Sequence, residues 1–171
     1  MSRPWEAREL RMTVDYLIQA HPEAKHMTRV RVGPLPSGAE AAAEEGISPR
    51  MYIPVLHWAD GVALYPDHIV LLEVKVKLHS DALGQILTNL DLFPDTPEFN
   101  DRRDLPISPE VVYAYPDRET LRMLDRHGIR AVRFRPDYIE AYYVEQLQKV
   151  YEPRPKVPGI AWERITRGAG E

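Results

Sequence analysis

Residues 58–85 hold acidic and basic side chains in a pattern that could perform metal-dependent hydrolysis. Asp60 is followed on a second apolar segment by Glu73, and Lys75 comes two positions later. Alternate side chains of a strand share a face, so Glu73 and Lys75 should project together, where Asp60 on a neighbouring strand could meet them. Two carboxylates and a backbone carbonyl suit Mg²⁺ or Mn²⁺. A lysine beside such an ion could orient or help deprotonate an attacking water and offset negative charge on a phosphate.

The apolar segment before Glu73 predicts that these charges lie at the interior of a sheet. Ile69–Leu72 is apolar and rich in β-branched residues, and it continues directly into Glu73. Burying such a charge is costly unless a metal or an ion partner meets it. Residues 51–64 and 68–77 read as two strands, and Tyr65-Pro66-Asp67 between them is typical of a turn. We therefore expect an antiparallel hairpin that brings Asp60 beside Glu73.

Apolar periodicity and capping signals predict the elements around this hairpin. They are a helix from Pro4 to before His21, a strand at 27–32, a helix capped by Ser80 and ending near Phe93, a strand at 111–115, a helix opened by Pro116-Asp117 and closed by His127-Gly128, a strand at 129–134 and a helix at 137–151. Segment 37–46 is either a short surface helix or a loop. We expect one domain over residues 1–151, and a proline-rich extended C-terminal arm over residues 152–171.

Composition limits the possible settings of this chemistry. The chain has 171 residues, 44% of them hydrophobic, with no cysteine and no apolar run long enough to cross a bilayer. Without an apolar signal core at its N-terminus, we expect a cytoplasmic protein of a bacterium or phage-infected host, or a virion component. A net charge of −4 argues against coating nucleic acid by bulk positive potential. Local arginines between residues 118 and 135 are either a solvated face or a phosphate-tracking surface.

The order of elements and the spacing of the charged residues resemble the PD-(D/E)XK nuclease superfamily, over roughly Trp5 to Phe134. The resemblance implies an α/β fold with a restriction-endonuclease-like αβββαβ core, a mixed central sheet and, here, an extra C-terminal helix. It also implies that Asp60 and Glu73 are metal ligands, that Val74 lends its carbonyl, and that Lys75 is the catalytic lysine.

Two further positions match the superfamily by resemblance. Glu6 matches an acid often found on the first helix, although Glu9 competes with it. Gln85 matches a glutamine on the helix after the lysine, but the aromatic residue usual one turn later is Asn89 here. Pro66-Asp67 spells the nominal motif but fits a turn better than a ligand, because it lies too close to Glu73 to leave room for a separate strand.

The expected function is a nuclease of phage or mobile-element type, dependent on Mg²⁺ or Mn²⁺, that hydrolyses DNA phosphodiester bonds with metal-activated water. The alternative is a nuclease-fold structural or adaptor subunit of a phage particle or other assembly. In that case residues 152–171 would dock on a neighbour, either a second copy or a phage structural protein. Neither hypothesis involves a membrane.

Overall fold

The computed structural model describes residues 4–35 and 56–151, with side chains for residues 7–35 and 56–145. Residues up to Ile139 form one compact unit, and residues from Glu140 onward belong to a second. The predicted division at residue 151 stays a prediction, as does the docking of the arm, because residues 152–171 lie outside the described part. Within the described residues no helix is long and apolar enough to cross a membrane.

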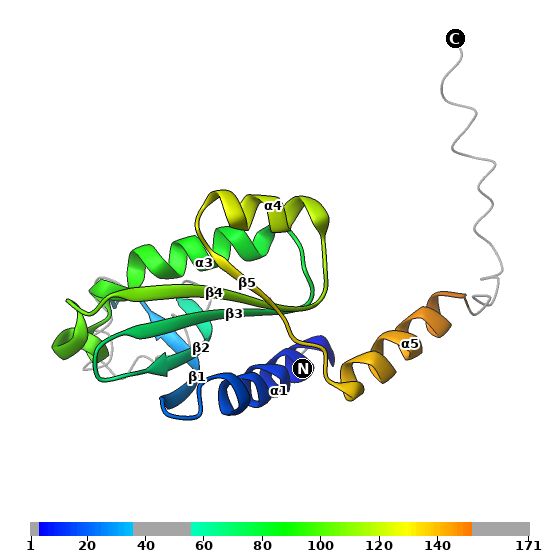
Figure 1. Ribbon diagram of the computed structural model, residues 1–171, viewed down its shortest axis with the longest axis horizontal. Coiled ribbons are helices and arrows are strands. Elements are labelled where there is room, and N and C mark those ends of the chain that lie inside the picture. Colours follow the sequence, from blue (N-terminus) through cyan, green and yellow to red (C-terminus); the bar gives the residue numbers. More distant parts are fainter. Residues whose placement is uncertain (1–3, 36–55, 152–171) are drawn as a thin grey trace, which may run out of the picture. The chain divides into compact units, whose positions relative to one another are not determined.

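One five-stranded mixed sheet forms the centre of the first unit (Figure 1). Its spatial order is β1-β2-β3-β4-β5. The pairs β1–β2 and β2–β3 are antiparallel, whereas β3–β4 and β4–β5 are parallel. The strands are β1 (Lys25–Val32), β2 (His57–Leu64), β3 (Ile69–Lys77), β4 (Ile107–Tyr115) and β5 (Arg130–Arg133).

Helices cover both faces of this sheet. Helix α1 (Pro4–Ala20) lies on one face, and α3 (Asp81–Leu92) and α4 (Arg118–Arg126) lie on the other (Figure 1). Two 3₁₀ helices, η2 (Phe93–Asp95) and η3 (Pro97–Arg102), lead into β4, and α5 (Asp137–Tyr151) follows β5. The order α1-β1-β2-β3-α3-β4 is the predicted αβββαβ core, so the predicted fold class is confirmed.

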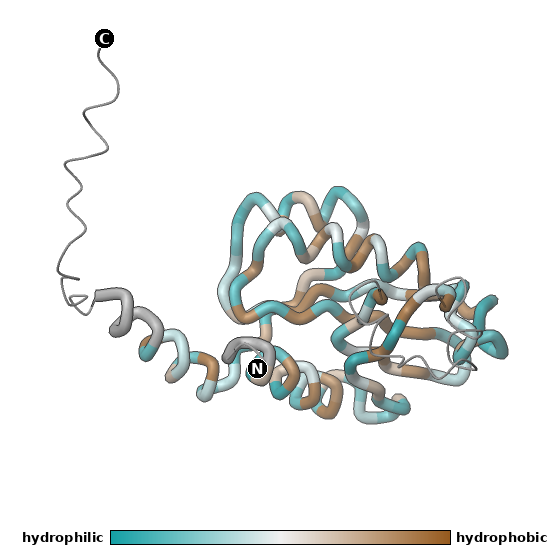
Figure 2. The backbone as a smooth tube through the Cα atoms, turned by 180° about the vertical axis from the view of Figure 1, so that it is seen from behind, coloured by the Kyte–Doolittle hydropathy of each residue, from teal (hydrophilic) through white to brown (hydrophobic). Residues whose placement is uncertain are grey.

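Strand β3 is central because its apolar run is buried on both faces. Ile69, Leu71 and Leu72 have no exposed surface. Ile69 and Leu71 join the core that includes Val62 of β2 and Ile86 of α3. Figure 2 shows hydrophobic residues following the strands and the inner sides of the helices. Burying each such side chain stabilises the fold by about 1.5–3 kcal/mol, and this gain offsets the cost of burying the adjoining Glu73.

Several predicted boundaries need correction. Ser80 stands at the N-cap position of α3 but has helical backbone angles and makes no capping side-chain bond. The segment between the helix predicted to end near Phe93 and the strand predicted at 111–115 contains η2 and η3. Strand β4 begins at Ile107 rather than Val111. Pro109 has no N–H to donate, and the strand accommodates it because β5 pairs with β4 only from Glu110 onward. Strand β2 begins at His57, and residues 51–55 of the predicted strand lie outside the described part.

The predicted ends of α4 are confirmed in detail. Asp117 caps its first turn by accepting the Thr120 N–H at 2.9 Å. Gly128 ends it with φ +67°, a left-handed conformation that glycine adopts at little cost. These caps fix where β4 stops and where β5 begins, and therefore which side chains emerge at that edge of the sheet.

Candidate active site

Strand β2 separates from β3 at Asp60. The paired residues run from Leu64 opposite Ile69 to Gly61 opposite Leu72, and the pairing ends there. The next β3 donor, the Val74 N–H, binds Asp60 Oδ2 at 2.8 Å instead. A side-chain carboxylate thus replaces the lost strand partner, which fixes Asp60 directly beside Glu73 and Lys75.

The other neighbour of Asp60 is also irregular. Arg29 of β1 would face Asp60, but the register passes from Thr28–Gly61 to Val30–Ala59 without pairing them. Arg29 has φ 50°, a left-handed conformation that costs a non-glycine residue about 1–2 kcal/mol. The sheet is therefore opened on both sides of Asp60. A hollow of about 80 Å³ forms there, lined by Glu9, Leu10, Thr13, Arg29 and Asp60.

Glu73 and Lys75 form a buried ion pair next to this opening. Lys75 Nζ lies 2.8 Å from Glu73 Oε1, and the two side chains are 15% and 4% exposed. Burial, followed by repulsion from Asp60, raises the pKa of Glu73 to about 8. Burial disfavours the charge of Lys75, but Glu73, Asp60 and Glu9 outweigh that effect and raise the pKa of Lys75. Lys75 is therefore a cation at neutral pH.

Glu9 supplies a third carboxylate from α1. Its Oε1 accepts the Val76 N–H at 3.2 Å, so Glu9 and Asp60 cap two alternate donors of β3. Burial raises the pKa of Glu9, and Asp60 also acts to raise it, whereas Lys75 acts to lower it. Three mutually repelling acids thus surround one lysine, and the exposed Arg29 acts only on Asp60. With all three acids ionised the site would have an excess of negative charge, and a bound cation would favour that ionised form.

The donor set fits a hard divalent ion. Among the described residues, hydrogen bonds and ion pairs use Oδ2 of Asp60 and Oε1 of Glu73, which leaves Oδ1 and Oε2 for another ligand. Oxygen ligands of this kind suit Mg²⁺, which keeps several waters and needs only one or two carboxylates. No group of three or more His, Asp or Glu side chains in the described part is arranged to hold a metal. Any ion here would need backbone oxygen and water in addition.

The structure brings together three of the predicted site residues, Asp60, Glu73 and Lys75, with Val74 between the last two. On α1 it is Glu9 that reaches them. The Glu6 side chain lies outside the described part, so its role stays a prediction. Apolar spacing along the helix could not decide between the two acids, because the choice depends on where β3 exposes an unpaired N–H.

Gln85 lies over a separate hollow. It is exposed on α3, and no hydrogen bond or ion pair joins it to Asp60, Glu73 or Lys75 within the described residues. That hollow, of about 400 Å³, is lined by Leu56, His57, Trp58, Gly84, Gln85, Thr88 and Asn89. Asn89 is buried and donates from Nδ2 to the Trp58 carbonyl at 3.1 Å, which ties α3 to the start of β2. Asn89 stands where the superfamily usually has an aromatic residue, and this hydrogen bond gives the asparagine a structural role.

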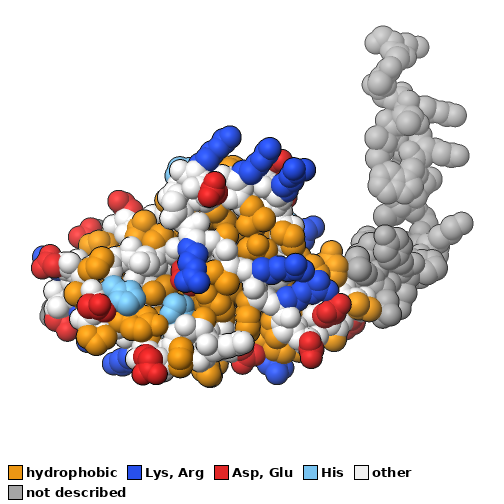
Figure 3. Space-filling model, in the orientation of Figure 1, with side chains coloured by type: hydrophobic (Ala, Val, Ile, Leu, Met, Phe, Trp, Pro, Cys, Tyr) orange, Lys and Arg blue, Asp and Glu red, His pale blue; other side chains and the backbone are white. Residues whose placement is uncertain are grey.

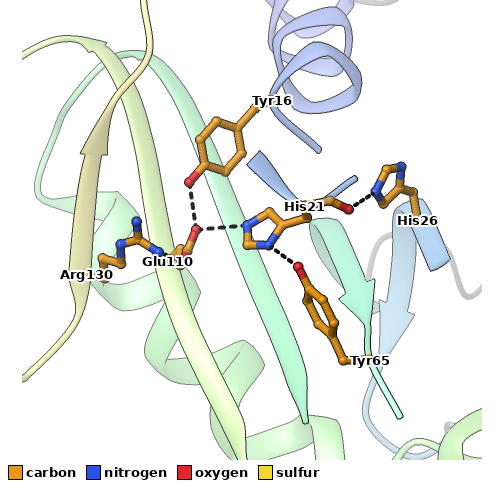
Figure 4. Close-up of polar contacts among 6 residues, drawn as sticks. All are labelled: Tyr16, His21, His26, Tyr65, Glu110 and Arg130. Atoms are coloured by element: carbon orange, nitrogen blue, oxygen red, sulfur yellow. Dashed lines mark hydrogen bonds and ion pairs between the residues drawn. The ribbon is translucent and has the colours of Figure 1, made fainter. Parts of the chain in front are cut away.

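A second polar cluster surrounds Glu110 of β4 (Figure 4). Glu110 is 3% exposed and is met by three partners. Oε2 accepts the Tyr16 hydroxyl at 2.8 Å and lies 3.4 Å from His21 Nε2, and Oε1 accepts Arg130 at 2.6 Å. His21 Nδ1 lies 3.0 Å from the Tyr65 hydroxyl. A buried carboxylate met by three partners ties the end of α1 to β4 and β5.

This Glu110 cluster was missed by sequence reasoning. Its only signal is an acid at the edge of the apolar run Val111–Ala114, and its partners Tyr16 and His21 lie far away in sequence. Four residues of the cluster, Glu110, His21, Tyr65 and Arg130, line a hollow of about 610 Å³, whose lining also includes Ala20, His68, Val70, Ile107, Ser108, Pro109 and Gly128. Glu110 is already engaged by its neighbours, and no hydrogen bond or ion pair among the described residues joins it to Asp60 or Glu73, so we assign it a structural role.

Comparisons with known proteins return solved structures alone. No family model and no curated protein matches the sequence. A crystal structure of a repair endonuclease from Pyrococcus abyssi aligns at 16% identity and TM-score 0.42, over 74% of this chain and 47% of that one. An EndoMS–dsDNA complex aligns at 15% identity and TM-score 0.42, over 74% and 44%. The chain thus spans about half the length of these structures.

Proposed function

We propose that this protein is a divalent-metal-dependent nuclease that hydrolyses phosphodiester bonds in DNA. The observation that carries the proposal is the convergence of Asp60, Glu73 and Lys75 where β2 leaves β3. Glu9 adds a third carboxylate from α1. Acids placed to repel one another at an opening in a sheet destabilise the protein unless a cation meets them, which is the arrangement expected of a functional site.

The residues that would hold the ion are Asp60 through Oδ1, Glu73 through Oε2, and Val74 through its backbone carbonyl. A bound Mg²⁺ or Mn²⁺ supplies a water nucleophile at neutral pH and stabilises charge on the phosphate. Asp60 is held rigidly for this role by the Val74 N–H, and Glu73 by Lys75. Such positioning lowers the entropic cost of aligning the reacting groups.

Lys75 would act as an electrostatic group in the reaction. Because its pKa is raised, its ammonium is charged in the resting site and can donate hydrogen bonds to a phosphate oxygen or to the attacking water. The water oxygen bonds to phosphorus and gives up a proton to solvent, the P–O ester bond breaks, and the departing alkoxide takes up a proton from solvent. Lys75 would offset the negative charge that grows on the phosphate oxygens during this exchange.

The test is cleavage of plasmid, linear duplex and single-stranded DNA with Mg²⁺, Mn²⁺ or EDTA. We expect metal-dependent cleavage by the wild-type protein, and a loss of about 10²–10³-fold or more for Lys75→Ala. Lys25→Ala is the matched control, because Lys25 is an exposed lysine at the start of β1. Circular dichroism would verify that both variants fold. Full activity of Lys75→Ala, or no cleavage of any substrate by wild-type protein with either metal, contradicts the proposal.

The adaptor alternative depends on residues 152–171, which lie outside the described residues, and it stays a prediction together with the phage or virion setting.

A further inference from the structure

Basic side chains gather where the parallel strands of the sheet end. Lys77 is the last residue of β3 and Arg133 the last of β5, Arg118 opens α4 just after β4, and Arg135 follows β5. The carboxyl ends of parallel strands lie at one edge of a sheet, so these four residues, here called the basic rim, share that edge. Figure 3 shows blue Lys and Arg side chains over α4 and β5 on one face of the molecule.

The strand register connects the basic rim to the candidate active site. Lys75 pairs in register with Tyr113, and Tyr113 with Arg133. Adjacent strands lie about 4.8 Å apart, so the Arg133 backbone is about 10 Å from that of Lys75 along this row. Lys77 pairs with Tyr115, whose ring lies 4.7 Å from the Arg135 guanidinium carbon. Residues in register share a face of the sheet, so the first row runs from the site to the rim, and the second row lies within the rim.

Three charges of the basic rim are available to a ligand. Lys77, Arg118 and Arg133 are exposed, and no ion pair engages them among the described residues. Arg130, by contrast, is paired with Glu110. Asp117, which precedes Arg118, is engaged within α4, where its Oδ2 accepts from the Thr120 N–H and hydroxyl. The rim therefore keeps a net positive charge in a chain of net charge −4.

We propose that the basic rim binds the phosphate backbone of the DNA strand that enters the Asp60–Glu73 site. The inference rests on the proposed function for the identity of the polymer and adds the surface that holds it. Each DNA strand carries a phosphate about every 3.4 Å of helix axis, so cations spread across three neighbouring strands meet several phosphates. Contacts of this kind position the nucleic acid without reading its sequence.

The experiment measures DNA binding by fluorescence anisotropy in EDTA, where cleavage cannot occur, with a labelled 20-base-pair duplex over a range of salt concentrations. The test variant is Arg118→Gln/Arg133→Gln. Its control is Lys25→Gln/Arg103→Gln, which removes the same charge from exposed residues at the start of β1 and before β4, at the opposite end of the parallel strands. We expect the rim variant to bind about tenfold or more weakly at 100 mM salt and to lose about two units of salt-dependence slope. The control should bind like wild type.

Binding by the rim variant equal to wild type, an equal loss in the control, or no binding by wild type overturns the inference. The same preparations are assayed for cleavage with Mg²⁺, which separates the two proposals. If wild type binds through the rim but does not cleave, the inference about the rim is supported and the nuclease proposal is contradicted. If wild type cleaves and the rim variant binds and cleaves DNA as wild type does, the nuclease proposal is supported and the inference about the rim is contradicted.

Discussion

Replacing Glu73 by glutamine should make the metal-free protein more stable at alkaline pH. The Glu73 carboxyl has an ordinary pKa of 4.5 when unfolded, and burial together with Asp60 raises the pKa to about 8 in the folded protein. Between these values the unfolded state releases a proton that the folded state retains. Stability is therefore full below pH 4.5 and falls as the pH rises to about 8, by about 1.4 kcal/mol per pH unit and about 5 kcal/mol in total.

Glutamine imitates the protonated carboxyl, so Glu73→Gln removes this dependence and leaves the other titrating groups in place. The assay is urea unfolding of both proteins in EDTA at pH 5, 6.5 and 8. We expect the two free energies of unfolding to lie close together at pH 5, and the variant to be more stable by several kcal/mol at pH 8. Mg²⁺ at pH 8 should stabilise wild type more than the variant. A difference between the two proteins that stays constant from pH 5 to 8 would refute the reasoning.

Two further substitutions test how the fold holds the site. Glu110→Ala should lower the free energy of unfolding by about 3–5 kcal/mol in urea melts, because it leaves the buried partners of the carboxylate unsatisfied. Glu119→Ala, which loses only an exposed ion pair, should change it by less than about 1 kcal/mol. Gly61→Ala should cost about 1–3 kcal/mol, because its Cβ would lie 2.8 Å from Thr13 Cγ2, and Gly84→Ala, with nothing within 4 Å, should instead raise the thermal midpoint. Equal effects of the members of either pair would contradict these assignments.

The hairpin and its three charged residues were predictable from the sequence because they depend on local rules. The turn at Tyr65-Pro66-Asp67 sets the register between two apolar strands, and alternation along β3 then places Glu73 and Lys75 together. Asp60 follows from the same register, since it would face Glu73. These relations require no knowledge of how distant elements pack.

The rest of the site depends on contacts between distant parts of the chain. Glu9 reaches Val76 only because β2 has left β3, and the left-handed backbone of Arg29 appears only once β1 and β2 pair around Asp60. The environment of Glu110 combines residues from α1, β4 and β5. A single sequence specifies these contacts through the packing of the whole domain, and residue spacing alone did not reveal them.

Cleavage of labelled duplex DNA in Mn²⁺ by wild type and by Asp60→Asn tests most directly whether Asp60 and Glu73 hold a catalytic ion. Asparagine keeps a carbonyl oxygen for the Val74 N–H, so the local fold should be preserved while a charged metal ligand is lost. We predict cleavage by the wild-type protein and its loss in the folded variant. Equal cleavage by both proteins would contradict the account.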